Sequence, residues 1–238
     1  MSENHILRAF DRDLDAIQGL VMKMGGLVET AITDAAHALE AGDLDEAERV
    51  RKADRDIDVL EYRINEEAAR VIALRAPTAG DLRVVLSVMK IASALERVGD
   101  YAKNMAKRTQ ALVELGHTPV VAQAGASLRR MTRAVTELLS DALDSYAARD
   151  VALAQDVRIR DQEIDQMYNA LFREFLTHML EDPRNITPCI HLHFIAKNIE
   201  RMGDHATAIA EQVVYLTTGE VPDDPRPKAE NVANLPKS

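Results

Sequence analysis

The stretch that decides the fold is Ile91-Ala-Ser-Ala-Leu-Glu-Arg-Val-Gly-Asp-Tyr-Ala102, because a near copy of it lies 104 residues further along the chain, at Ile195-Ala-Lys-Asn-Ile-Glu-Arg-Met-Gly-Asp-His-Ala206. Seven of the twelve positions are identical. A repeat at a fixed spacing indicates a duplicated structural unit. Apolar residues recur in both copies at intervals of three and four, which is the period of an α-helix with one buried face. We therefore expect both copies to be amphipathic helices in equivalent positions of two similar units.

A second pair of matching segments lies upstream of the first. Asp54-x-x-Ile57-Asp58 matches Asp161-x-x-Ile164-Asp165 at an offset of 107 residues. The change of offset from 107 to 104 is what a shorter loop before the last helix would produce. The alternative explanation is chance similarity among alanine-rich helices. We predict two tandem three-helix bundles and a disordered, proline-rich tail, with boundaries at 1–116, 117–218 and 219–238.

The composition of the chain agrees with an all-α fold. Of the 238 residues 47% are hydrophobic, only 4% are aromatic, and Gly and Pro number 10 and 8. A core of Ala, Leu, Val, Ile and Met favours helices, and a β-rich chain would need more turn residues. Thr78 with Asp81, and Thr187 with Pro188, are the expected starts of the third and sixth helices. The periodicity predicts six long antiparallel helices with short connections, at about 6–41, 44–74, 78–115, 120–148, 151–180 and 187–217.

Charge and cysteine usage restrict the possible partners. A formal net charge of −10 disfavours nucleic acid and anionic membrane surfaces and favours cations. The single cysteine, Cys189, excludes an internal disulfide and a cysteine-based zinc site. The first fifteen residues are charged throughout, unlike a signal peptide, and no apolar run is long enough to span a bilayer. We expect a soluble, cytoplasmic protein.

Each predicted unit carries two pairs of acidic residues spaced i, i+4. Like charges at this spacing destabilise a helix slightly, so a single pair usually marks only a solvated face. Repetition at matching positions of both units indicates a shared role. At about 100° per residue the acids lie on the flank of each helix, toward solvent, and equivalent flanks face each other in an antiparallel pair. The pairs are Asp54/Asp58 with Glu96/Asp100, and Asp161/Asp165 with Glu200/Asp204.

The position of these flanks depends on which residues form the buried stripes. The expected stripe of the second helix is Ala53, Ile57, Leu60, Ile64, Ala68 and Val71. That of the third helix is Val84, Val88, Ile91, Leu95, Val98, Ala102 and Met105. In each unit the four carboxylates are then expected to converge on one surface groove.

Four converging carboxylates repel one another unless a cation lies among them. Oxygen ligands suit Mg²⁺, Mn²⁺, Ca²⁺ or iron and also accept Zn²⁺. We therefore expect a divalent or multinuclear metal, with Fe, Zn, Mn or Mg as candidates, in a groove of each unit. Gly99 and Gly203 lie inside predicted helices, where each costs about 1 kcal/mol relative to Ala. Their lack of a side chain would let either a metal or a neighbouring helix approach, and the sequence favours neither explanation.

Taken together, these segments resemble those of the PhoU family. The resemblance covers residues 5–219 and rests on the paired Glu-Arg-Val-Gly-Asp and Glu-Arg-Met-Gly-Asp segments, the two Asp-x-x-Ile-Asp segments, and the sequences 75–83 and 181–186. It implies an adaptor that represses phosphate-starvation signalling when phosphate is plentiful. Such an adaptor links the ATPase of the phosphate ABC transporter to a membrane sensor histidine kinase, as a homodimer peripheral to membrane complexes. The resemblance also implies that the eight acids hold multinuclear metal clusters, which need not be alike because Asn104 is matched by Ala208.

Three other functions compete with this interpretation. A ferritin-type di-iron oxidase needs two inward Glu-x-x-His pairs, and only Glu114 with His117 has that spacing. A purely structural helical adaptor without metal is a second alternative. A histidine phosphotransfer protein is a third, although the counterpart of His205 is Tyr101. Its candidate phosphoacceptors are His37, His178, His191, His193 and His205. Because no phosphate loop, nucleotide motif or Ser/His/Asp set appears, we predict a non-catalytic regulator.

Overall fold

The computed structural model of the chain describes residues 2–116 and 118–222, with side chains from residue 10 onward. Every regular element in these ranges is helical, which confirms the all-α prediction. The elements are α1 (Ser2–Ala41), α2 (Leu44–Arg75), α3 (Ala79–Glu114), α4 (Pro119–Ala148), α5 (Val151–Glu181), the short 3₁₀ helix η1 (Pro183–Asn185) and α6 (Ile186–Thr218). His117 and most of the predicted tail, residues 223–238, lie outside the described residues.

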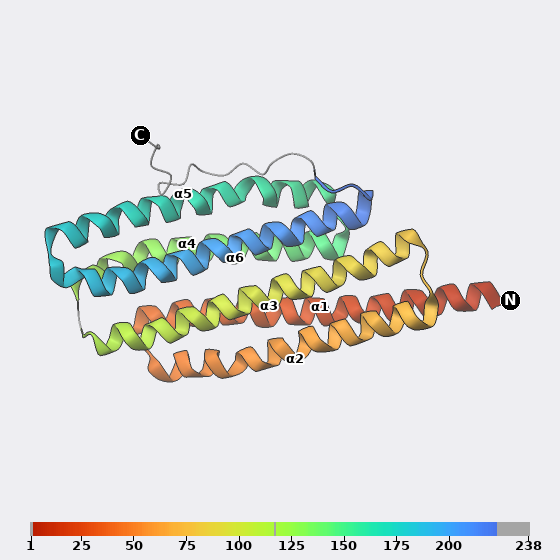
Figure 1. Ribbon diagram of the computed structural model, residues 1–238, viewed down its shortest axis with the longest axis horizontal. Helices are drawn as coiled ribbons and strands as arrows, with labels where there is room; N and C mark the ends of the chain where they lie inside the picture. Colours follow the sequence, from red (N-terminus) through yellow and green to blue (C-terminus); the bar gives the residue numbers. More distant parts are fainter. Residues whose placement is uncertain (1, 117, 223–238) are drawn as a thin grey trace.

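The helices form two three-helix bundles that lie side by side (Figure 1). Helices α1, α2 and α3 pack against one another, as do α4, α5 and α6. The bundles meet where α3 packs along α6 and α1 packs along α4. The central helices α3 and α6 run in opposite directions, and they carry the duplicated segments 91–102 and 195–206 (Figure 1). The division into domains at residue 116 stays a prediction, because the packing of α3 on α6 joins the bundles.

Two equivalent turns start the second helix of each bundle. Gly42 and Arg149 adopt positive φ angles of 64° and 53°, which end α1 and α4. Asp43 Oδ1 then accepts hydrogen bonds from the backbone N–H groups of Asp45 and Glu46, both at 2.9 Å. Asp150 caps α5 in the same way. A capping aspartate satisfies backbone donors that the first turn of a helix leaves free, so the same turn geometry recurs in both bundles.

The predicted starts of α3 and α6 need correction. Thr78 is the N-cap of α3, but its hydroxyl donates to Asp81 Oδ2 at 3.2 Å instead of accepting from the backbone. The prediction of Thr187 as N-cap of α6 is wrong, because the helix begins at Ile186 after η1. Asp182 accepts the N–H of Arg184 and starts the turn earlier. Pro188 is tolerated in the first turn because the N–H groups there have no partner within the helix.

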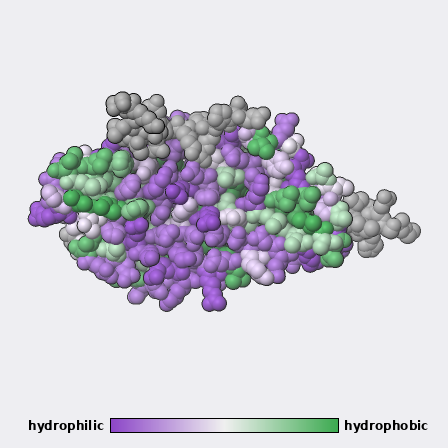
Figure 2. All heavy atoms as spheres, in the orientation of Figure 1, coloured by the Kyte–Doolittle hydropathy of each residue, from purple (hydrophilic) through white to green (hydrophobic). Residues whose placement is uncertain are grey.

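The core follows the predicted apolar stripes except at two positions. Ala53 is exposed because the neighbouring Asp54 turns inward and is only 5% exposed. Val84 is half-buried, whereas Val85 is fully buried, because α3 packs against α1, α2 and α6 and its buried face is wider than one stripe. The face shown in Figure 2 is mostly hydrophilic, with hydrophobic residues gathered near both ends. Within the described residues, no helix has the length and apolar character needed to cross a bilayer.

The burial of α3 gives a direct test of the fold. Leu95 is completely buried at the centre of α3, and we expect Leu95→Asp to lower the free energy of unfolding by about 4 kcal/mol or more, because it buries an unpaired charge. Urea unfolding followed by circular dichroism measures the effect. Ser93→Asp, at an exposed position of the same helix, is the matched control and should change stability by less than about 0.5 kcal/mol. Equal stability of the two variants would contradict the described packing of α3.

Candidate metal centre

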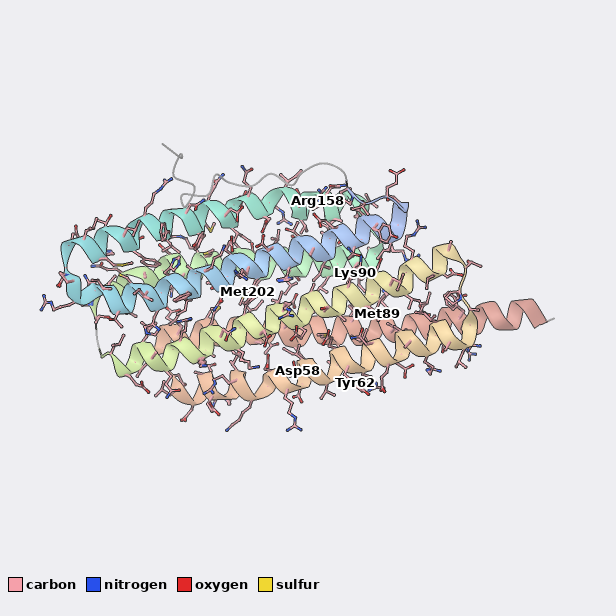
Figure 3. The ribbon with its side chains drawn as sticks, in the orientation of Figure 1. Asp58, Tyr62, Met89, Lys90, Arg158 and Met202 are labelled. Atoms are coloured by element: carbon pink, nitrogen blue, oxygen red, sulfur yellow. The ribbon has the colours of Figure 1, made fainter. Side chains whose placement is uncertain are left out.

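The acids of the first bundle lie where α2 faces α3. Asp54 is buried, Asp58 is exposed, and Glu96 and Asp100 are half-buried. Asp58 lies midway along α2, one turn before the exposed Tyr62 (Figure 3). These four acids are referred to below as the first acidic groove.

A lysine already supplies positive charge to the first acidic groove. Lys103 Nζ lies 2.5 Å from Asp54 Oδ2 and 3.4 Å from Asp100 Oδ1. It therefore joins one acid of α2 to one acid of α3. The sequence interpretation missed Lys103, although its position three residues after Asp100 is the spacing of a helical ion pair.

The remaining two acids of this groove are held near other negative charges. Asp58 is exposed, but partial desolvation, and then the charge of Asp54, raise its pKa; Lys103 opposes the shift, and Asp100 on the facing helix adds a smaller increase. Burial, and then the charge of Asp100, raise the pKa of Glu96, with Asp58 among the smaller contributors. Each of these acids therefore senses a carboxylate of the facing helix. The convergence of all four acids on one site stays a prediction.

The second acidic groove lies between α5 and α6 and is more deeply covered. Asp161, Asp165 and Glu200 are 1%, 8% and 9% exposed, and Asp204 is half-buried. Lys197 Nζ lies 2.6 Å from Glu200 Oε1. The other carboxylate oxygen, Glu200 Oε2, is buried and has no hydrogen-bond partner among the described residues. This groove also contains its own lysine, which the sequence interpretation missed.

The prediction that the acids face solvent is therefore wrong for half of them. The physical reason is that a helical wheel describes one helix alone, whereas in the structure the facing helix packs closely against this flank. A flank that lies beside the buried apolar stripe of one helix is then covered by the facing helix. The corrected residues are Asp54, Asp161, Asp165 and Glu200.

Two glycines permit this close approach. A Cβ on Gly99 would lie 3.0 Å from Ile57 Cδ1, and a Cβ on Gly203 would lie 2.5 Å from Asp161 Oδ1 and 3.2 Å from Ile164 Cδ1. Ile57 and Ile164 are equivalent residues of the Asp-x-x-Ile-Asp segments. Of the two explanations that the sequence left open, the structure shows close helix packing at both glycines.

The two acidic grooves contain the type of ligand atom that a hard cation prefers, but their side chains are not arranged around a common ion position. Their donors are carboxylate oxygens, the ligands that hard divalent ions prefer. Within residues 10–116 and 118–222, no three His, Cys, Asp or Glu side chains are placed to hold one ion. The ion pairs of Lys103 and Lys197 take up three of the carboxylates instead. Metal binding therefore stays a prediction, and it would require these lysines to withdraw.

His193 and His205 of α6 are half-buried and pack against aromatic rings. His193 contacts Tyr168 and Phe172, with ring centroids 5.9 and 5.2 Å apart, and His205 contacts Tyr101 at 5.7 Å. Burial, followed by nearby positive charges, lowers the pKa of both histidines. Half-buried, neutral rings packed against aromatic residues differ from the exposed histidine that a phosphotransfer protein needs.

Comparison with known proteins places this architecture in one family. The PhoU domain family model matches residues 21–109 and 128–213. The chain is 45% identical to a phosphate-specific transport system accessory protein PhoU homolog of Rhizobium meliloti, over 99% of this chain and 98% of the relative. A protein of the same name from Zymomonas mobilis is 46% identical, over 94% of this chain and 93% of the relative.

Solved structures give the same result. The crystal structure of PhoU from Pseudomonas aeruginosa superposes with a TM-score of 0.84 at 37% identity, covering 89% of this chain and 100% of that one. The phosphate transport system regulatory protein PhoU from Streptococcus pneumoniae superposes with a TM-score of 0.81 at 30% identity, covering 90% of this chain and 99% of that one. The chain belongs to the PhoU family.

Proposed function

We propose that this protein is a cytoplasmic, non-catalytic regulator of phosphate uptake. The observation that carries the proposal is its similarity, over nearly the whole chain, to proteins named as accessory to the phosphate-specific transport system. A solved relative is titled a regulatory protein of phosphate transport. In the finer form of the proposal, a homodimer links the ATPase of the phosphate ABC transporter to a sensor histidine kinase and represses phosphate-starvation signalling.

We propose further that the two acidic grooves bind metal. The duplicated carboxylates support this, as does the buried oxygen Glu200 Oε2, which has no hydrogen-bond partner among the described residues. A bound cation would supply the positive charge that Lys103 and Lys197 now provide, together with open coordination positions. The protein's part is to hold the carboxylates on closely packed helices. The ligands would be Asp54, Asp58, Glu96 and Asp100, and Asp161, Asp165, Glu200 and Asp204.

Metal content tests the assignment one groove at a time. We expect Glu96→Ala/Asp100→Ala to lower the metal content per chain by about half, because only the first acidic groove loses ligands. Elemental analysis of protein purified without chelator measures the loss. Helicity should be nearly unchanged, because both residues are half-buried on the flank of α3. The matched control is Asp56→Ala/Glu163→Ala, which removes two exposed acids at equivalent positions of α2 and α5. Full metal retention in the groove variant would contradict the assignment.

The pH dependence of metal-free protein tests the electrostatics of the first groove. Because the pKa of Asp58 is raised in the folded state, the native protein binds more protons than the unfolded chain between the ordinary and the raised pKa. The contribution of Asp58 to stability is therefore lost as pH rises through this interval. We expect Asp58→Asn to raise the melting temperature at pH 7 and to have little effect below about pH 4.

The control for this measurement is Asp56→Asn, on an exposed face of the same helix. It removes the same charge without touching the groove and should change the melting temperature little at either pH. A lower melting temperature for Asp58→Asn at pH 7, with none at low pH, would show that the charged form of Asp58 is stabilising and would refute the sign argued here.

Partner binding tests how the grooves and the regulatory role connect. Open positions on a groove-bound cation could accept a carboxylate or phosphate of a partner, and the uncompensated grooves would repel an acidic surface. We expect the affinity for the purified cytoplasmic domain of the kinase, or for the transporter ATPase, to differ several-fold between metal-loaded and chelator-stripped protein. Binding isotherms of both forms measure this. Equal affinities, at equal helicity and oligomeric state, would leave the cation a structural role only.

A further inference from the structure

A cavity of about 970 Å³ opens between the two bundles at the end where α1 and α3 finish and α4 begins. Most of its lining is apolar, with threonines and a few charged residues among it. This volume and this mixture are typical of sites for small ligands. None of the eight acids of the two grooves lines this cavity, and nothing in the proposed function uses it.

The duplication of the chain provides an internal reference for this cavity. Helices α1 and α4 end at Ala41 and Ala148, so the offset of 107 found in the sequence continues through them. The burial patterns of the two helices also repeat at this offset. Helices α1 and α4 are therefore equivalent helices that pack against each other. As a result, the residues at one end of their interface correspond to the residues at the other end.

At the other end of the interface the equivalent space is filled. Leu143 is 3% exposed and lies so close to Gly25 that a Cβ there would be 2.5 Å from Leu143 Cδ1. Tyr146 is 5% exposed, and burial raises its pKa to about 12. A large side chain therefore packs into the gap left by a glycine, as in an ordinary well-packed interface.

At the cavity end the counterparts of these residues leave the space open. Leu143 and Tyr146 are replaced by Ala36 and Leu39, which are only half-buried, and Gly25 is replaced by Thr132. The two ends are therefore packed with different side chains: Ala36 replaces the leucine that fills the other end, and Thr132 replaces the glycine that receives it. The cavity is thus present at one end of the α1–α4 interface, whereas Leu143 and Tyr146 are buried at the equivalent end. The arrangement of the helices alone therefore does not explain it.

The charged residues that line the cavity indicate the sign of a ligand. Arg129 pairs with Glu40, whereas Arg133 has no ion pair with any acid among the described residues. His37 is hydrogen-bonded to Glu46, so any positive charge on its ring is balanced by that carboxylate. Of the charged side chains that line the cavity, Arg133 therefore supplies an uncompensated positive charge, on a chain whose formal net charge is −10.

We propose that this cavity binds a small amphipathic anion. Its apolar body lies between α1 and α4, against Ala36, Leu39 and Leu128, and its anionic head lies at Arg129 and Arg133. Charge complementarity selects the anion, and the missing large side chains provide room for the apolar body. This proposal does not depend on metal binding or on phosphate regulation.

The test uses n-dodecyl phosphate as probe and isothermal titration calorimetry as the measurement on the full chain. We expect saturable binding to the wild-type protein. Ala36→Leu/Leu39→Tyr/Thr132→Gly copies the three residues of the filled end, including the glycine that makes room for the leucine, and we expect it to weaken binding at least ten-fold while leaving helicity nearly unchanged. Dodecyltrimethylammonium, which has a similar chain and the opposite charge, should bind at least ten-fold more weakly than dodecyl phosphate.

A second variant keeps the test valid if the filled variant folds poorly. Arg133→Gln should weaken dodecyl phosphate binding about ten-fold through the loss of a charge-assisted hydrogen bond. Arg130→Gln, an exposed residue of α4 that does not line the cavity, is the matched control and should leave the affinity unchanged. If Arg133→Gln and Arg130→Gln weaken dodecyl phosphate binding equally, the loss of affinity comes from the change in net charge and not from a contact in the cavity. That result would overturn the proposal.

Other occupants of the cavity give different results. If a second copy of the chain fills it, light scattering will show a change of oligomeric state in Ala36→Leu/Leu39→Tyr/Thr132→Gly. If residues 223–238 fill it, their removal will increase the affinity for dodecyl phosphate. Either result, or the absence of saturable binding to the wild-type protein, would overturn the proposal.

Discussion

The close packing of α2 on α3 at Gly99, and of α5 on α6 at Gly203, is the constraint on which the acidic grooves depend. At each glycine a side chain of the facing helix occupies the space where a Cβ would be. This approach brings the flanks of the paired helices together and covers carboxylates that would otherwise be solvated. Burying a carboxylate is costly unless it is paired, so the packing itself creates the need for a nearby positive charge.

The two bundles meet this need with lysines from different turns. Lys103 lies one turn after Asp100 in the first bundle. The equivalent position of the second bundle holds the buried Thr207. Lys197 lies one turn before Glu200, and its counterpart is the exposed Ser93. Neither lysine therefore has a lysine at the equivalent position of the other bundle. The demand for a cation is common to both grooves, whereas the group that meets it is not.

The fold could be predicted from the sequence because its signals are local or repeated. The helices follow from apolar periodicity, and the two bundles follow from the duplicated segments. The acids of the grooves were also identified, because their spacing is preserved in both copies. All of these features are visible along one helix at a time.

What could not be predicted depends on the distance between helices. A helical wheel places Asp54 and Asp161 on a flank, but only the approach of the facing helix at Gly99 and Gly203 shows that they are buried. The start of α6 was misplaced because the capping of η1 by Asp182 competes with the signal of Thr187 and Pro188. Lys103 and Lys197 were missed because a search for repeated residues passes over those present in only one copy.

The same reasoning applies to the interface between α1 and α4. Duplication gives both ends of this interface the same backbone, so a difference in packing between them must come from side chains alone. Leu143 packs into the gap at Gly25 at one end, whereas the equivalent residues Ala36 and Thr132 line the cavity at the other end. A vacant apolar space sacrifices dispersion contacts and burial that the filled end retains. A ligand that fills the cavity would restore contacts of this kind.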